Sequence, residues 1–286
     1  MTLLSTHSPV TAGGRRGRRG AAIAVCAGAF AFVASIAGCS AAAKPLTARM
    51  AISLAADKTQ SVTSMAATFS DQISGTVAET TSGTLEMQIK PTLIADANAT
   101  ASADGQTFPI DEIVSTRAMY LKSTVFSVFT GQTGKPWIEI PFASLSGNLG
   151  ASLTGLLQNV QNGDPLTQTK MLAASKNVRA VGSQVINGVL TTHYRGSFTA
   201  SAALASLSPA LRREVAPLLK MVSGDIQFSA WIDAQHVVRR VTEVETVGGE
   251  TVHSTINVTS VNRPVRVALP SASEAVVLTK SDLGGM

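Results

Sequence analysis

The chain has 286 residues, a formal net charge of +5 and only two cysteines, Cys26 and Cys39. Four of its 23 basic residues are arginines within residues 1–38, which hold no acidic residue, so the rest of the chain carries 19 basic and 18 acidic residues. This near-neutral remainder excludes a broad basic surface for nucleic acid, and two cysteines exclude a disulfide-rich domain or a cysteine-ligated zinc site.

The first 39 residues have the three parts of a bacterial lipoprotein signal. Four arginines at 15–19 precede an apolar run of about 14 residues at 21–34, which is shorter than the roughly 20 residues that span a bilayer. Small residues then lead to a cysteine in Ile36-Ala37-Gly38-Cys39, although such sites prefer Leu where Ile36 stands. The sequence therefore predicts cleavage before Cys39 and acylation of its sulfur. An uncleaved membrane anchor is the alternative.

This interpretation divides the chain into three parts. Residues 1–38 are the cleaved signal peptide, 39–47 are the acylated N-terminus with a short tether, and 48–286 are one folded domain. The protein is then expected to be exported and anchored by lipid to the outer face of the cytoplasmic membrane. Because eight extended residues reach under about 30 Å, the domain is expected to lie near the bilayer. The pair Arg18-Arg19 leaves the choice between general and twin-arginine export open.

In the first half of the domain, segments whose apolar residues follow a helical period alternate with segments whose apolar residues follow a two-residue period. Apolar residues without an intervening Gly or Pro predict a helix over Leu46–Lys58. Strands are expected at 62–73, 84–90, 93–101, 113–122 and 137–140, with a turn at 75–83. The apolar stripe from Leu149 to Val160 predicts a second helix, and Asp164-Pro165 predicts the start of a third that runs to about Ser175.

The second half contains the strongest local signal for a hairpin. Asn187-Gly188 separates two alternating segments, 178–186 and 189–199, and this pair favours the two positive φ angles of a tight turn. A helix is expected from Ser208-Pro209 to Val222, with a kink at Pro217. Three long strands follow at 225–233, 237–247 and 251–261. The total of eight to ten antiparallel strands with two or three inserted helices predicts an α+β fold, one large curved sheet with helices on one side.

One face of the predicted sheet is apolar but small in volume. The segment 93–101 places Leu93, Ala95, Ala97, Ala99 and Ala101 on one side, and 226–232 adds Ile226, Phe228, Ala230 and Ile232. Alanine at such positions permits two structures. Either a helix packs closely on the strand, or the face forms the wall of an apolar ligand pocket.

Catalysis is not expected. The three histidines after residue 39, His193, His236 and His253, begin no zinc-protease motif, and no serine lies in a G-x-S-x-G turn. The loop Gly131–Pro136 is too short for a phosphate-binding loop. The sequence therefore predicts no enzyme activity, no cofactor and no metal site.

Five segments together resemble the LppX/LprG group of actinobacterial envelope lipoproteins, which are related in fold to the LolA/LolB carriers. These segments are the cleavage site at Cys39, Ser61-Val62-Thr63-Ser64, Trp137-Ile138-Glu139-Ile140-Pro141, Ala230-Trp231-Ile232-Asp233 and Val238-Arg239-Arg240-Val241. Each motif is short and structural, and the resemblance rests on their order and spacing over most of the chain after Cys39.

The resemblance implies more than the residues do. Members form a strongly curved antiparallel half-barrel whose helices cover the concave face and enclose an apolar cavity for lipid or glycolipid acyl chains. It implies acylation at Cys39 and a carrier that moves lipid within the cell envelope as a monomer, without nucleic acid. The ligand-binding residues expected from alternation are Leu93, Ala95, Ala97, Ala99, Ile226, Phe228 and Ile232. A non-carrier interaction or sensor lipoprotein with a filled core is the alternative.

Overall fold

A computed structural model describes residues 46–145 and 172–283, apart from residues 77, 132, 176, 208, 210, 211, 214, 215, 217 and 218. Cys39 and the helix expected at 149–160 lie outside the described residues. So do Pro217 and most of the helix expected at 164–175. The helix expected at 208–222 is described only in part.

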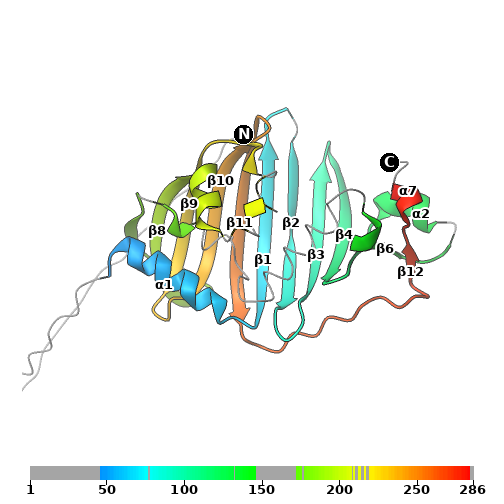
Figure 1. Cartoon of the computed structure of the whole chain (residues 1–286), viewed down its shortest axis with the longest axis horizontal. Helices are drawn as coiled ribbons and strands as arrows, with labels where there is room; N and C mark the ends of the chain where they lie inside the picture. Colours follow the sequence, from blue (N-terminus) through cyan, green and yellow to red (C-terminus); the bar gives the residue numbers. More distant parts are fainter. Residues whose placement is uncertain are drawn as a thin grey trace, which may run out of the picture. The chain divides into compact units, whose positions relative to one another are not determined.

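One sheet of twelve strands dominates the described residues (Figure 1). Its strands are β1 (Ser64–Ser74), β2 (Glu79–Gln88), β3 (Ile94–Ala103), β4 (Gln106–Ser115), β5 (Ala118–Lys122), β6 (Trp137–Pro141), β7 (Arg179–Ile186), β8 (Val189–Thr199), β9 (Val222–Asp233), β10 (Val238–Val247), β11 (Glu250–Val261) and β12 (Ala275–Val277). The order across the sheet is β12-β6-β5-β4-β3-β2-β1-β11-β10-β9-β8-β7. Because β12 and β7 are separate edges, the sheet is not closed into a barrel.

The sequence predicted eight to ten strands, all antiparallel, whereas the described residues form twelve. Strand β12 pairs in parallel with β6, so the sheet is mixed. The segment 113–122, expected to be one strand, forms parts of β4 and β5. The Ser115 hydroxyl oxygen accepts hydrogen bonds from the backbone N–H groups of Arg117 (3.3 Å) and Ala118 (3.1 Å), which holds the turn between these strands.

Two further boundaries differ from the sequence-based expectation. The supposed turn at 75–83 ends early, because β2 begins at Glu79 and includes Gly83. Strand β9 begins at Val222, where a helix was expected to end. The β7–β8 hairpin is confirmed, with φ angles of 49° at Asn187 and 79° at Gly188. The strands expected at 84–90 and 93–101 are confirmed as parts of β2 and β3, which pair as an antiparallel hairpin.

The described helices are few and short. They are α1 (Ala48–Gln60), η1 (Thr124–Phe126), α2 (Ser127–Thr130), η2 (Phe142–Ser144), α5 (Ala200–Ser206) and α7 (Lys280–Leu283). The Thr47 hydroxyl caps α1 by accepting from the Met50 N–H (3.2 Å), and the Thr199 hydroxyl caps α5 through the Ala202 N–H (3.1 Å). The first cap confirms the expected helix near Leu46–Lys58, whereas α5 was not expected.

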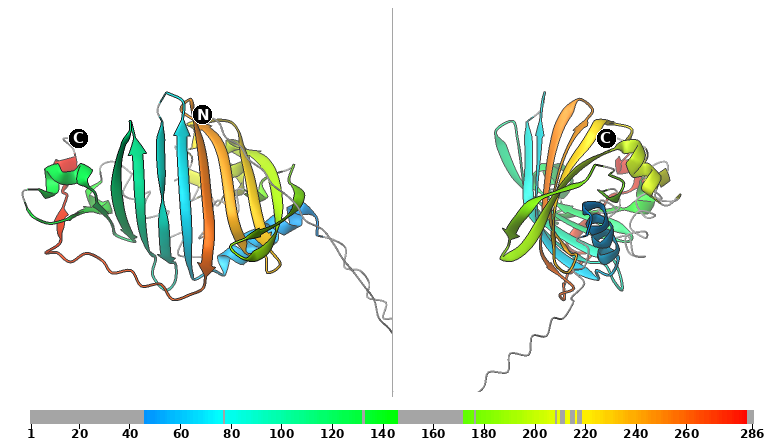
Figure 2. Two further views of the ribbon diagram at one scale, coloured as in Figure 1. Left: turned by 180° about the vertical axis from the view of Figure 1, so that it is seen from behind. Right: turned by 90° about the vertical axis from the view of Figure 1, so that its left-hand side faces the viewer.

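Helices α1 and α5 lie on the same side of the sheet (Figure 2). Their buried faces pack on β8, β9 and β10 in one apolar cluster. Its buried members include Ala51, Ile52 and Ala55 of α1, Ala203 of α5, and Tyr194, Phe198, Ile226, Phe228, Ala230, Ile232 and Val238 of the sheet. We call the side that carries this cluster the helix face and the opposite side the outer face.

Candidate functional site

A continuous apolar row crosses the helix face from β4 to β7. Residues directly opposite on antiparallel strands share a face, so the register defines the row. In strand order it contains Ile110, Ala99, Gly83, Phe69, Ile256, Val241, Ala230, Tyr194 and Ala180. The alternation seen in the sequence therefore extends across nine strands, between segments that lie far apart in the chain.

The two parts of this row differ in packing. On the α1 side, Ala230 is 0% and Tyr194 9% exposed, within the cluster under the helix. On the other side, Phe69, Gly83 and Ala99 are only half-buried. A Cβ atom at Gly83 would lie 2.2 Å from the Asn98 carbonyl oxygen, so glycine is required at this position of the β2–β3 pair. Gly83 and Ala99 therefore add little side-chain volume to the middle of the face.

The structure separates the expected ligand-binding residues into two groups. Ala95, Ala97 and Ala99 lie together on the helix face of β3, in register with Met87, Leu85 and Gly83 of β2. Ile226, Phe228 and Ile232 are each 3% exposed and pack in the α1 cluster. Leu93 precedes β3 and packs in a second cluster with Val62, Met65, Ala67, Ile89 and Val258. Their contact with a ligand stays a prediction, and Ala97 and Ala99 are the most accessible of them.

Acidic side chains border the apolar row, which the sequence analysis did not predict. Removal from water raises the pKa of Glu243 to about 7, and the nearby Glu245 carboxylate adds to this rise. Burial also raises the pKa of Glu245 and that of Glu112. Glu243 lies in register with Phe228 on one side and Ser254 on the other, and Ser254 is opposite Asp71. Glu243 therefore places a carboxyl that accepts a proton near neutral pH on the otherwise apolar helix face.

A cleft of about 610 Å³ lies where the C-terminal segment passes the ends of β2–β5. Leu93, Ile94, Val267 and Leu269 give it an apolar lining, and two arginines, Arg117 and Arg266, also line it. Its volume falls within the roughly 300–1,000 Å³ of small-molecule sites. This cleft is a second location with the composition to take an amphiphile.

Comparisons with known proteins agree with the expected group. No family model matches the chain. A curated relative, an uncharacterized 31.2 kDa protein from the rplA–rplJ intergenic region of Streptomyces griseus, is 26% identical over 230 residues, which are 77% of this chain and 72% of that protein. LprF from Mycobacterium bovis is 14% identical and covers 79% of this chain and 97% of its own, with a TM-score of 0.49. Lipoprotein LppX from Mycobacterium tuberculosis is 16% identical and covers 77% and 98%, with a TM-score of 0.48.

A LolA superfamily protein from Nitrosomonas europaea is more distant, at 8% identity and a TM-score of 0.28 over 77% of this chain and 96% of that one. The chain resembles the LppX/LprG group. This confirms the likeness predicted from the sequence, but TM-scores below 0.5 transfer no ligand and no residue role. The function of this chain is therefore argued below from its own residues.

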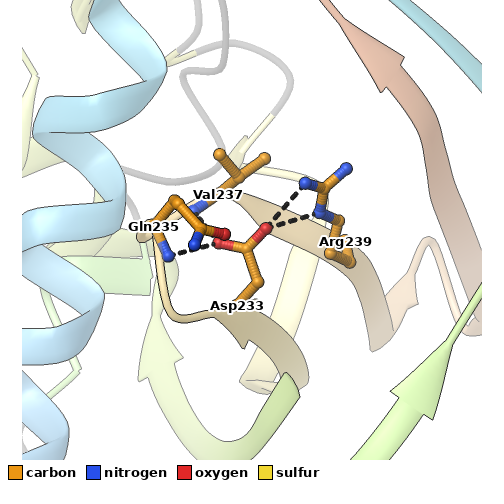
Figure 3. Close-up of polar contacts among 4 residues, drawn as sticks. All are labelled: Asp233, Gln235, Val237 and Arg239. Atoms are coloured by element: carbon orange, nitrogen blue, oxygen red, sulfur yellow. Dashed lines mark hydrogen bonds and ion pairs between the residues drawn. The ribbon is translucent and has the colours of Figure 1, made fainter. Parts of the chain in front are cut away.

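The segments Ala230–Asp233 and Val238–Val241 belong to the β9–β10 hairpin, whose turn is shown in Figure 3. Asp233 is 4% exposed; its Oδ1 accepts hydrogen bonds from the N–H groups of Gln235 and Val237, both at 2.9 Å. Its Oδ2 accepts from Arg239 Nε at 2.7 Å and forms an ion pair with the other end of the same guanidinium. Asp233 therefore holds the turn of this hairpin together through both its backbone and its Arg239 contacts.

Trp231 and Arg240 lie on the outer face of the sheet. The Trp231 ring stacks on His193 with centroids 4.2 Å apart, and its Nε1–H donates to Gln184 Oε1 at 2.8 Å. The Arg240 guanidinium lies 5.4 Å from the Trp231 ring centroid and donates to Asn257. The Trp231 ring therefore lies on the side of the sheet opposite to the apolar row.

Within the described ranges, no helix is long and apolar enough to cross a membrane. The same residues form no cluster of three or more His, Cys, Asp and Glu side chains arranged to hold a metal ion. Burial and the neighbouring Arg195 lower the pKa of His193, which favours its neutral form beside Trp231.

Proposed function

We propose that this protein is an envelope lipoprotein, acylated at Cys39, that binds lipid or glycolipid acyl chains on its helix face and carries them within the cell envelope. The observation that supports this most directly is the half-buried part of the apolar row, where Phe69, Gly83 and Ala99 carry no charge and are not fully covered by other side chains. The sequence signal that ends at Cys39 supports the membrane anchor.

Such a surface requires no polar recognition motif. Each methylene removed from water contributes about 0.8 kcal/mol, so a long acyl chain supplies its own driving force. A diacylglyceryl thioether on Cys39 would add two chains to the membrane, and two lipid chains give stable attachment where one does not. The proposed activity is therefore binding and transfer, without a chemical step.

A second candidate is a non-carrier interaction lipoprotein with a filled helix face. The cluster under α1 favours it, because Ile226, Phe228 and Ile232 already pack against side chains and leave no room there. The two candidates differ in what surrounds Ala99.

Ala99→Phe distinguishes them. If the face is an open acyl-binding surface, we expect the free energy of unfolding to change by less than about 1 kcal/mol while uptake of a fluorescent fatty-acyl probe falls strongly. If the face is a packed core, overpacking lowers the unfolding free energy by about 1–3 kcal/mol. Urea denaturation and probe titration of the full chain measure both quantities.

Thr100→Phe is the matched control, because Thr100 is exposed on the outer face of the same strand. It should leave probe uptake unchanged. Leu269, which lines the cleft by the C-terminal segment, is 48% exposed, so Leu269→Glu reports on that location. Loss of uptake in Leu269→Glu with normal uptake in Ala99→Phe would move the proposed site to the cleft. No uptake by the unaltered protein would contradict lipid binding.

Cys39→Ser tests the anchor independently. The variant cannot form the thioether, so we expect it to lose incorporated radiolabelled palmitate and to leave the membrane fraction of the producing cells. Cys26→Ser is the control, because Cys26 lies in the expected signal peptide. Equal labelling of Cys39→Ser and the unaltered protein would rule the acylation site out.

A further inference from the structure

The outer face carries a small cavity over the strands β7–β10. Its volume is about 170 Å³. A single cross-strand row supplies four of its lining residues, since Arg179 is opposite Arg195, Arg195 is opposite Ser229, and Ser229 is opposite Thr242. Gln227 also lines it. All of these residues except Arg179 stand on strands with neighbours on both sides, so the cavity rests on a rigid base.

The charge in this cavity is one-sided. Arg179 and Arg195 lie directly opposite on paired strands, a position in which like charges destabilise a sheet. Within the part of the chain that the structure describes, neither guanidinium forms a hydrogen bond or an ion pair, and the lining residues include no carboxylate. The field of Arg195 is also felt by His193, whose pKa it helps to lower. A bound anion would offset the repulsion between these two arginines.

We propose that this cavity binds a phosphate- or sulfate-type oxyanion. Guanidinium groups donate paired hydrogen bonds to such anions, and two that face each other can hold one anion between them. The hydroxyl groups of Ser229 and Thr242 and the amide of Gln227 are neutral donors on the same floor. The cavity is smaller than the roughly 300–1,000 Å³ of small-molecule sites, so it fits a single oxyanion group rather than a whole metabolite.

This inference is independent of the proposed acyl-binding function. The cavity with its two arginines lies on the outer face, whereas the apolar row lies on the helix face. The anion has two sources with the same chemistry. It is either the phosphate of an anionic lipid head group in the membrane near the tether or a free phosphate ion.

The test compares the full chain with the double variant Arg179→Gln/Arg195→Gln. Thermal unfolding is followed in inorganic phosphate and in chloride at one ionic strength. We expect phosphate to raise the unfolding temperature of the unaltered protein, and the apparent affinity for phosphate to fall about tenfold for each arginine removed. Arg49→Gln, which removes an exposed arginine of α1, should behave like the unaltered protein.

The unfolding temperature in chloride also shows whether the double variant is folded. Because it removes a like-charge pair, the double variant should unfold in chloride at a temperature no lower than that of the unaltered protein.

Flotation with phosphatidylcholine vesicles, with and without phosphatidylglycerol, then identifies the source of the anion. Both proteins carry Cys39→Ser in this experiment, so that the acyl anchor plays no part. Loss of binding to phosphatidylglycerol vesicles in the double variant supports a lipid head group. A phosphate response without this loss supports the free ion. Equal phosphate responses of the double variant and the unaltered protein, or no response of either, would overturn the proposal.

Discussion

Asp233→Ala is expected to lower the free energy of unfolding by about 3–5 kcal/mol, because it leaves a half-buried guanidinium without its partner. Asp233 accepts from two backbone N–H groups and from Arg239, whose side chain is only 19% exposed. Removing the carboxylate also leaves the N–H groups of Gln235 and Val237 without an acceptor at the β9–β10 turn. Urea denaturation at neutral pH measures the loss.

An exposed ion pair on the same sheet is the control. Lys122 Nζ lies 2.9 Å from Asp111 Oδ2, with side chains 47% and 27% exposed, and such a pair contributes about 0–1 kcal/mol. Asp111→Ala should therefore change the unfolding free energy by less than about 1 kcal/mol. If both substitutions had equal effects, the desolvation of the Asp233 pair would not be what makes it important.

Glu243→Gln is expected to stabilise the protein at pH 7.5 and to flatten its pH dependence. The pKa of this carboxyl is about 7 in the folded protein and 4.5 as the ordinary value, so the folded state binds more protons between these two values. The stability that this group contributes is fully present below about pH 4.5 and is lost as pH rises through about 7, a change of about 3 kcal/mol. Glutamine carries no charge at either pH, so the variant should lack this part of the fall.

Unfolding free energies at pH 5 and pH 7.5 test this expectation. Glu86→Gln is the control, because Glu86 is exposed on the outer face of β2. Some slope should remain in Glu243→Gln, since the pKa values of Glu112 and Glu245 are also raised by burial. A Glu243→Gln variant with the full pH dependence of the unaltered protein would show that the proton is taken up elsewhere.

Local chemistry made several elements predictable. Asn187-Gly188 specifies a tight turn through its own backbone preferences, and the β7–β8 hairpin follows from it. The two-residue period of 93–101 correctly placed Ala95, Ala97 and Ala99 on one face. The turn at Ser115 was missed because no glycine or proline marks it. The strand β12 was missed because three residues are too few to show a period.

The pairing of strands that lie far apart in the sequence could not be predicted from local residue patterns. Strands β1 and β11 are central neighbours, and the Thr63 N–H donates to Asn262 Oδ1 at 2.8 Å across 199 residues of sequence. No local preference specifies such a pair, because its energy comes from side chains that meet only in the folded chain. For the same reason alternation gave Ile226 and Phe228 the same expected role as Ala99, although α1 covers only the first two.

The sequence by itself determined the features that depend on neighbours in the chain. These are the residue pattern that predicts a signal ending at Cys39, the hairpin turns and the alternation that makes one side of each strand apolar. The tertiary structure alone decided which strands lie together. That arrangement joins Ala99, Gly83 and Phe69 into one surface, places Glu243 beside it, and sets Arg179 opposite Arg195 on the other side. The physical reason is that periodicity is local, whereas burial and the electrostatic field at a side chain depend on every strand packed around it.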